Sequence, residues 1–379
     1  DDRAATTCNN GRSMMAIPRL CLATLLLAQG AALSAMTEAQ VPTVTRAERS
    51  EVVAGIAREM NARYVFPDVA AQVERALAAK ARNNEYDRLD DPLQFAARPT
   101  ADLQEVTHDK HIRVRYSIAP LPQRAGQGGP PTPTELVEER AREQGRNFGV
   151  ERVERLPANI GYIDLRGFAE LALSAPAITA AMTLVAHTDA LIVDLRRNGG
   201  GDPATVAFMT SYLFDTRTHL NDLYWREGDR TEQFWTQDWV PGVRFGQPRP
   251  VFVLTSAGTF SGAEEFANNL KTQKRATLVG EVTGGGANPG DVQRLSAHFS
   301  MFVPSGRAVN PVTHSNWEGT GVTPDVAVPA DQALRTAQLM ALKGLAATAR
   351  DPERDKAIAA RIAELESAPD ARSAPARID

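Results

Sequence analysis

The sequence contains a serine at the point where an apolar, strand-like run gives way to a helix-like pattern. Residues 251–255 have the character of a buried strand, and a turn of small residues leads from them to Ser261 and Gly262. Apolar residues recur at helical spacing after the serine, so Ser261 is expected at an exposed strand end where a helix begins. A hydroxyl group there can act as a nucleophile, and the free Gly262 amide can bind an oxyanion. The alternative is an ordinary N-cap serine.

A second turn of chemical interest follows another strand-like run. Residues 194–201 (DLRRNGGG) end in three glycines, and a helix is expected to begin at Pro203. Glycines let a backbone approach a ligand closely, so the amides of Gly199 and Gly200 are candidates for the other half of an oxyanion hole. The alternatives are a simple tight turn and a phosphate-binding loop, but the segment lacks the Walker pattern and its lysine.

A base and an orienting carboxylate are available elsewhere in the chain. Only six histidines are present, and two of them, His108 and His111, precede the alternating strand pattern of residues 112–116. His111 is a candidate base for a serine nucleophile, and Glu318, in a Gly-containing loop, could orient an imidazole and balance its charge. The competing interpretations are ordinary surface residues and a metal site. Two histidines without an identified third ligand make a poor case for zinc, and we expect no metal.

The elements that must hold these groups fall into five segments. We expect a leader and signal peptide at residues 1–39, a small helical domain at 40–119, a linker with a short helix at 120–150, a catalytic α/β domain at 151–330, and C-terminal helices with a tail at 331–379. A chain of 379 residues exceeds the roughly 250–300 residues that one core usually supports. Strand-like and helical patterns alternate after residue 150, which predicts an α/β sheet.

An aromatic segment within this α/β region is a candidate substrate-binding wall. Residues 224–235 form an expected hairpin that turns at Gly228 and Asp229. Its aromatic side chains could contact apolar substrate side chains; they are Tyr224, Trp225, Phe234 and Trp235. The alternative is that these rings only pack the hairpin onto the rest of the protein.

The N-terminal segment has the composition of an export signal. Positive charges precede an apolar run at residues 20–27, and small residues follow it as far as Ala35. Cleavage after Ala35 or Ala39 would place a mature protein without cysteine in the periplasm or outside the cell. The run is too short for a comfortable transmembrane helix, so no stable membrane span is expected after leader removal. The alternative is a buried N-terminal helix.

The overall composition indicates which classes of binding partner to expect. The net charge is −4, 43% of the residues are hydrophobic and 23% are charged, which is ordinary for a globular protein. Lysine and arginine do not cluster, so we expect no nucleic-acid partner. We also expect no cofactor.

Together these segments resemble the C-terminal-processing (tail-specific) and tricorn-core serine peptidases. The resemblance rests on motifs that occur in family order: DLRRNGGG (194–201), TFSGAEEF (259–266), VGEVTGG (279–285) and WEGTGVTPD (317–325). It covers roughly residues 159–334 and extends to residues 108–111. Within the family the chain looks most similar to the interphotoreceptor retinoid-binding protein modules and their bacterial peptidase relatives.

The resemblance also indicates which catalytic groups to expect. Processing peptidases use a Ser-Lys dyad, but the expected lysine position is Gly286 here, and no lysine lies between Lys274 and Lys343. The tricorn-like branch uses a Ser-His-Glu triad instead. The resemblance therefore implies Ser261 as the nucleophile, His111 as the base and Glu318 as the orienting carboxylate.

The implied fold is a ClpP/crotonase-like mixed sheet with a small N-terminal helical domain and C-terminal helices. Processing peptidases usually carry a PDZ module before the catalytic core, but residues 117–155 are too short for one. The implied activity is hydrolysis of peptide bonds in exported or envelope polypeptides through an acyl-enzyme. The alternative is a non-catalytic carrier of retinoid-like or fatty-acid ligands on the same fold. The oligomeric state stays open.

Overall fold

The computed structural model describes residues 43–122, 132–347 and 351–367, so the expected leader and both cysteines lie outside the described residues. The helices are α1 (Arg46–Arg63), α2 (Pro67–Arg82), α3 (Pro92–Thr107), α4 (Pro133–Gly145), α5 (Leu171–Val185), α6 (Pro203–Ser211), α7 (Gly262–Thr272), α8 (Ala333–Ala346) and α9 (Pro352–Ser367). The strands are β1 (Val114–Tyr116), β2 (Val150–Leu156), β3 (Ile160–Leu165), β4 (Ala190–Asp194), β5 (His219–Trp225), β6 (Arg230–Trp235), β7 (Val251–Thr255), β8 (Thr277–Gly280), β9 (Gly290–Arg294), β10 (Phe299–Pro304), β11 (Gly306–Val309) and β12 (Val326–Ala327).

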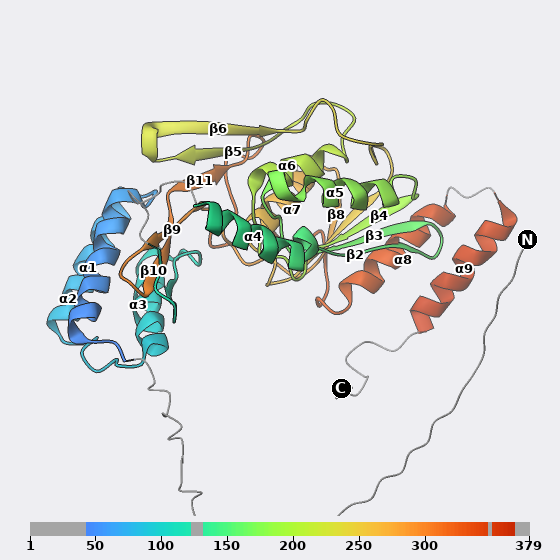
Figure 1. Ribbon diagram of the computed structural model, residues 1–379. Helices are drawn as coiled ribbons and strands as arrows, with labels where there is room; N and C mark the ends of the chain where they lie inside the picture. The colour runs from blue at the N-terminus through green and yellow to red at the C-terminus, as the bar shows by residue number, and fades with distance from the viewer. Residues whose placement is uncertain (1–42, 123–131, 348–350, 368–379) are drawn as a thin grey trace, which may run out of the picture. The chain divides into compact units, whose positions relative to one another are not determined.

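A six-stranded mixed sheet forms the centre of the α/β part, as expected. Its strand order is β12-β8-β7-β4-β3-β2, with β2 antiparallel to β3 and the remaining neighbours parallel. Helices cover both faces: α5, α6 and α7 pack on one face, and α8 and α9 pack on the other (Figure 1). Parallel strands buried on both faces read as continuous apolar runs, which explains the patterns at β3, β4 and β7.

Side chains alternate between the two faces of this sheet. Ile163, Val193 and Val253 belong to the core under α5–α7, whereas their neighbours Ile192 and Phe252 belong to the core under α8 and α9. The period of two along each strand produces this division. The sheet is therefore held rigidly from both sides, and its strand ends are firm supports for the loops that follow them.

The N-terminal helices pack against a second sheet rather than forming a purely helical unit. The antiparallel sheet β1-β10-β9 contributes Val114, Phe299 and Met301 to the same core as Ile56 of α1 and Phe95 of α3. The β9–β10 hairpin, which lies far along the chain, thus completes the core of the N-terminal part.

The helix α2 begins at a proline and has no side-chain cap. Phe66 is the N-cap residue and Pro67 is the first helical residue, so Asp68 lies within the first turn. Proline suits this first position because its missing N–H has no intrahelical partner there.

A third sheet holds the aromatic hairpin. Its order is β11-β5-β6, and a 3-10 turn at Glu227–Asp229 joins β5 to β6, which confirms the expected turn. β6 contacts α6, and β5 contacts α7 (Figure 1). The hairpin therefore lies next to the helix that begins after Ser261.

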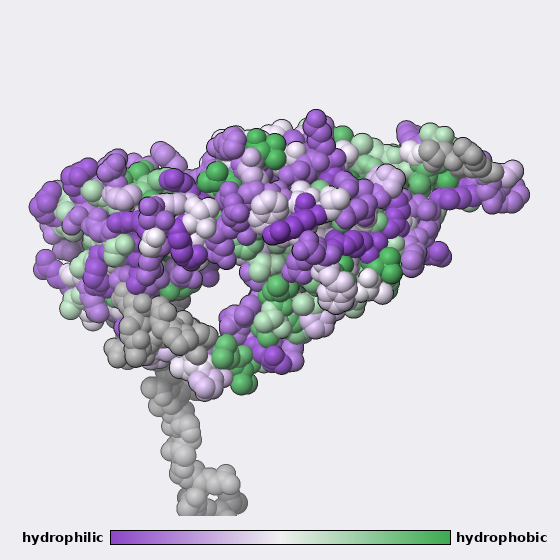
Figure 2. Space-filling view, turned by 90° about the horizontal axis from the view of Figure 1, so that it is seen from above, coloured by the Kyte–Doolittle hydropathy of each residue, from purple (hydrophilic) through white to green (hydrophobic). Residues whose placement is uncertain are grey.

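Hydrophilic residues cover most of the face shown in Figure 2, and the hydrophobic residues on it are scattered in small groups. Among the described residues, no helix combines the length and the apolar character needed to cross a membrane.

Candidate active site

Two loops from neighbouring strands meet at the carboxyl edge of the central sheet. β4 and β7 are adjacent and parallel, so the glycine-rich turn after β4 and the serine-containing turn after β7 must lie side by side. Hydrogen bonds join them: the Thr259 hydroxyl donates to the Leu195 carbonyl at 2.8 Å, and the Phe260 N–H donates to the Asn198 carbonyl at 3.1 Å. The two expected halves of the oxyanion hole are thus brought together.

Ser261 has an unusual backbone conformation. It is the N-cap residue of α7, with φ 53° and ψ −123°, a region that residues with a Cβ atom rarely adopt. A serine held at positive φ between a strand and a helix presents its hydroxyl outward, as a nucleophile elbow does. Its side chain lines a cleft of about 840 Å³.

The glycines around Ser261 differ in what their amides do. The Gly200 N–H donates to Asn198 Oδ1 at 2.8 Å, so it is already occupied. Gly200 instead permits close packing, because a Cβ atom there would lie 2.8 Å from the Ser261 Cβ and 2.7 Å from the Gly262 nitrogen. Gly199 and Gly262 both line the cleft with Ser261. Of the three glycines expected to form an oxyanion hole, these two remain candidates.

Glu264 holds the beginning of α7 and the loop 283–286 together. Its buried carboxylate accepts hydrogen bonds from the Ser261 N–H at 2.9 Å, the Gly285 N–H at 2.7 Å and the Gly286 N–H at 2.8 Å, and from the Thr283 hydroxyl at 2.5 Å. Burial raises the pKa of Glu264, while these hydrogen bonds lower it. The side chain thereby ties the loop 283–286 to the beginning of α7.

His111 lies against the same loops. Its ring centroid is 4.5 Å from that of Phe260, which precedes Ser261, and 5.6 Å from that of Phe302. Only 8% of the His111 side chain is exposed, yet it lines the cleft with Ser261. His108, by contrast, is exposed at the end of α3, where it adopts the left-handed conformation.

The expected lysine position is filled by neighbouring rings. A Cβ atom on Gly286 would lie 2.3 Å from the Phe260 ring and 2.6 Å from Cε1 of His111. The imidazole therefore occupies space that a side chain at position 286 would need. This matches the absence of a dyad lysine from the sequence.

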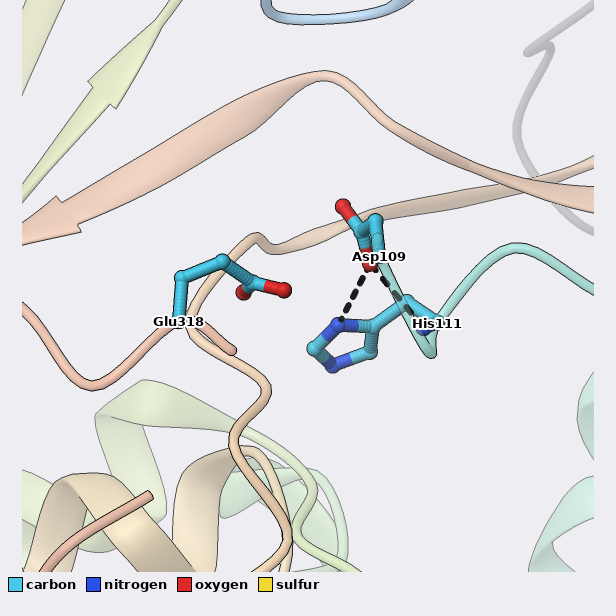
Figure 3. Close-up of side chains that lie close together, drawn as sticks. All are labelled: Asp109, His111 and Glu318. Atoms are coloured by element: carbon cyan, nitrogen blue, oxygen red, sulfur yellow. Dashed lines mark hydrogen bonds and ion pairs between the residues drawn. The ribbon is translucent and has the colours of Figure 1, made fainter. Parts of the chain in front are cut away.

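Two carboxyl groups face the imidazole (Figure 3). Asp109 Oδ1 lies 3.4 Å from His111 Nδ1, and one oxygen of each carboxyl group lies within 4.8 Å of a ring nitrogen. Asp109 also accepts the His111 backbone N–H at 3.0 Å and the Asn288 amide at 2.9 Å. Glu318 Oε2 accepts the Ala287 N–H at 2.5 Å, whereas Oε1 has no partner.

These carboxyl groups influence each other. Burial raises the pKa of Glu318, and the negative charge of Asp109 raises it further, while the hydrogen bond from Ala287 acts in the opposite direction. Burial and the charges of Asp109 and Glu318 also raise the pKa of Tyr64, so the phenol stays protonated. A positive charge on His111 would interact favourably with the carboxylates of Asp109 and Glu318.

The same three residues are the group in the described part of the chain that could hold a metal ion. Asp109, His111 and Glu318 offer one imidazole nitrogen and two carboxylate oxygens within 4.8 Å of one another. Such donors suit a divalent cation such as Zn²⁺. A metal there would compete with proton transfer at the imidazole.

The four aromatic residues of the hairpin lie in three different places. Trp225 and Phe234 line the cleft with Ser261. Trp235 stacks on His219 with a centroid distance of 4.2 Å and lines a second cavity of about 460 Å³. Tyr224 packs against the N-terminal core and under the guanidinium of Arg307, so it lies away from the cleft.

Sequence reasoning missed Asp109 and Glu264 as parts of the site. The spacing of Asp109 two residues before His111 was a usable signal, because an aspartate often accepts the backbone N–H two residues further on. The two consecutive glutamates after Gly262 carried no such signal. Their roles depend on which way each side chain points from α7.

The chain matches known families and structures. Residues 159–328 match the model described as Peptidase family S41, and residues 32–144 match the N-terminal domain of peptidase S41 in eukaryotic IRBP. The chain is 30% identical over 179 residues to carboxyl-terminal-processing peptidase 2, chloroplastic, of Arabidopsis thaliana, which covers 45% of this chain and 32% of that protein. The chain thus spans about a third of this curated relative.

The chain is also similar to solved structures. A structure from Parabacteroides merdae, described as a candidate peptidase, aligns with a TM-score of 0.50 at 20% identity, covering 86% of this chain and 99% of that one. The photosystem II D1 C-terminal processing protease aligns with a TM-score of 0.44 at 18% identity, covering 76% and 94%.

Proposed function

This chain belongs to peptidase family S41, and from that membership we propose that it is a serine peptidase with Ser261 as the nucleophile, His111 as the base and Glu318 as an orienting carboxylate. One observation carries the proposal. Ser261, strained at the start of α7, and His111, enclosed beside Phe260, line a single cleft although they come from distant parts of the chain.

The proposed reaction follows from these groups. The neutral His111 imidazole accepts the Ser261 hydroxyl proton as the oxygen attacks the peptide carbonyl carbon. The imidazolium then gives that proton to the leaving amine, the C–N bond breaks, and an ester to Ser261 remains. A water molecule, deprotonated by His111, hydrolyses the ester and returns the serine to its starting state. Glu318 and Asp109 stabilise the imidazolium in both halves.

The tetrahedral oxyanion would be held by backbone amides. Gly262 and Gly199 line the cleft beside Ser261, whereas the Gly200 N–H is occupied by Asn198. Loss of one oxyanion-hole donor typically raises the barrier by ~3–4 kcal/mol. The tight packing of Gly200 against Ser261 and Gly262 keeps the two amide-bearing turns in register.

The lining of the cleft favours a peptide over a lipophilic ligand. Lys110, Arg113 and Arg115 line the cleft, and so do Asp202 and Glu265. A carrier for retinoid-like or fatty-acid ligands would be expected to bury its ligand among apolar side chains. We therefore propose peptides or unfolded proteins as substrates.

We further propose that the protein is exported. The argument rests on the charged, apolar and small-residue pattern that ends at Ala35, in a segment outside the described residues. N-terminal sequencing of the exported protein tests it. A mature protein that begins before Leu33 would rule out cleavage of the leader.

The function is tested with Ser261→Ala. The variant should fold normally, because removing a hydroxyl at a turn leaves no large cavity, and it should lose peptide hydrolysis and labelling by a fluorophosphonate probe. Ser315→Ala, in an exposed loop, is the control and should keep both. A chelator should not change the activity. A fully active Ser261→Ala variant would refute the serine mechanism, and loss of activity with chelator would favour a metal at Asp109, His111 and Glu318.

A further inference from the structure

A second group of enclosed polar atoms lies in the cleft wall beside Ser261. Among the described residues, Glu265 Oε1 and both polar side-chain atoms of Asn221 and Asn269 are enclosed and have no hydrogen-bond partner. Glu265 is 4% exposed, and both asparagines are fully buried. Unpaired buried polar groups are costly, so a cluster of them indicates that something else completes their hydrogen bonding.

The three side chains approach one another from two elements. Glu265 and Asn269 are four residues apart on α7, and therefore on one face of the helix, while Asn221 comes from the neighbouring strand β5. Burial raises the pKa of Glu265, and the two asparagines act in the opposite direction by lowering it. Of the three, Glu265 lines the cleft. The asparagines thus lie behind the carboxyl group.

Glu265 is one helical turn from the nucleophile. Its backbone N–H donates to the Ser261 carbonyl at 3.0 Å, so the two residues are about 6 Å apart along the helix axis, and both line the cleft. In a peptide bound at Ser261 and at the Gly262 amide, the side chain of the residue before the scissile bond could extend along the part of the cleft between Ser261 and Glu265. A lysine stem of four carbons reaches about as far as the carboxyl group.

The residues that line the cleft near Glu265 suit a side chain with an aliphatic stem and a positively charged end. Pro203, Ala204, Leu223 and Phe234 supply apolar surface, and Glu265 has no ion-pair partner among the described residues. Asp202 adds negative charge nearby. Burial and this charge raise the pKa of Glu265 to about 8, so a cation bound beside it would stabilise the charged carboxylate.

Building on the proposed peptidase function, we propose that Glu265 forms the floor of a subsite that selects lysine or arginine immediately before the scissile bond, with Asn221 and Asn269 positioning its carboxyl group. The bound cation would donate to Glu265 Oε1, which has no hydrogen-bond partner among the described residues, and its stem would lie on Leu223 and Phe234. A hydrocarbon side chain of equal length would leave the carboxyl group unpaired.

The wild-type protein provides the first test. Matched peptides that differ only in lysine or norleucine before the scissile bond are compared by kcat/KM, after cleavage sites have been located in a peptide library by mass spectrometry. Lysine should be preferred at least about tenfold. Equal rates would overturn the subsite while leaving the peptidase function intact. No cleavage of any peptide, with no labelling of Ser261, would overturn both proposals.

Variants provide the second test. Glu265→Gln keeps the shape of the side chain and should bring the lysine-to-norleucine ratio to within about threefold of one, mainly by slowing lysine cleavage. Glu232→Gln is the matched control, because Glu232 lies exposed on β6 at the same cleft, and it should keep the preference. Fluorophosphonate labelling confirms that each variant is folded. An unchanged ratio in Glu265→Gln, or an equal loss in Glu232→Gln, would refute the assignment.

Discussion

The imidazole of His111 is held by packing, not by hydrogen bonds of standard geometry. It lies between the rings of Phe260 and Phe302, and neither ring nitrogen has a hydrogen-bond partner. A small rotation would bring Nδ1 within hydrogen-bond distance of Asp109, which is 3.4 Å away. Catalytic hydrogen bonds are often long before substrate binds, so this geometry is compatible with a base.

We predict that His111, and not His108, is required for activity. His111→Asn should lower kcat by about a thousandfold or more, because the imidazole is the proposed acceptor of the serine proton and asparagine cannot take its place. His108→Asn is the matched control, since asparagine tolerates the left-handed conformation of this exposed residue. Steady-state kinetics on one peptide decides between them. Equal losses, or a greater loss at position 108, would contradict the assignment.

We also predict that Glu318 and Asp109 act on the same imidazole. Glu318→Gln and Asp109→Asn should each lower kcat by about 10²-fold or more, and the double variant should lose less than the product of the two effects. Peptidase assays and thermal unfolding of all three variants separate catalysis from folding. Full activity in Glu318→Gln beside a large loss in Asp109→Asn would move the orienting role to Asp109.

At the scale of elements, the loop 283–286 connects the segments that carry the proposed nucleophile and the proposed base. Glu264 fixes this loop to α7, and the Lys110 ammonium donates to the Gly284 carbonyl at 2.6 Å. The loop thereby also contacts the segment that carries His111. Because His111 and Phe260 fill the space at Gly286, the packing requires a glycine at this position.

We therefore predict that Gly286→Ala impairs the enzyme. The added methyl group would overlap the rings of Phe260 and His111, at a cost of about 1–3 kcal/mol in the free energy of unfolding, and would displace the base. Gly344→Ala in α8 is the control, because its Cβ atom meets no neighbouring atom and alanine favours a helix. Chemical denaturation and kcat measure the two effects. A Gly286→Ala variant with normal kcat would show that His111 does not need this space.

At the scale of the whole molecule, the site joins two hydrophobic cores. Ser261 is attached to the core of the six-stranded sheet, whereas His111 adjoins Ile112, which belongs to the core of α1–α3 and the sheet β1-β10-β9. The buried bond from the Asn288 amide to Asp109 links the two parts beside the base. A change in the packing of either core is therefore expected to alter the position of Ser261 relative to His111.

Buried acids should also make the global stability depend on pH. The pKa of Glu265 is raised to about 8 in the folded protein, against an ordinary value of 4.5, so the folded state binds more protons than the unfolded state between these values. The free energy of unfolding should then fall as pH rises from about 5 to 8.

We predict that Glu265→Gln weakens this fall, because the neutral amide does not ionise. Denaturant unfolding of the wild type and the variant at pH 5 and pH 8 measures it. Glu232→Gln, an exposed control, should keep the wild-type slope. Identical pH dependence in the wild type and Glu265→Gln would show that Glu265 does not carry the raised pKa.

Local patterns of the sequence determined the elements and the turn that contains Ser261. Continuous apolar runs predicted the doubly covered strands β3, β4 and β7, and the strand-to-helix junction predicted the place of Ser261. Helix boundaries are less apparent from such patterns: α5 begins at Leu171 and contains Pro176 in its first turns, although proline commonly marks a helix start. Periodicity records which residues are buried, and that is why these elements were predictable.

Only the tertiary structure decided which side chains meet. Asp109 faces His111 and Glu318 because the segment after α3 and the loop before β12 approach the same sheet edge. The consecutive residues Glu264 and Glu265 look equivalent in the sequence, yet one anchors a loop and the other is enclosed in the cleft wall. Such contacts join distant residues, and their geometry arises from packing between elements, which local patterns do not encode.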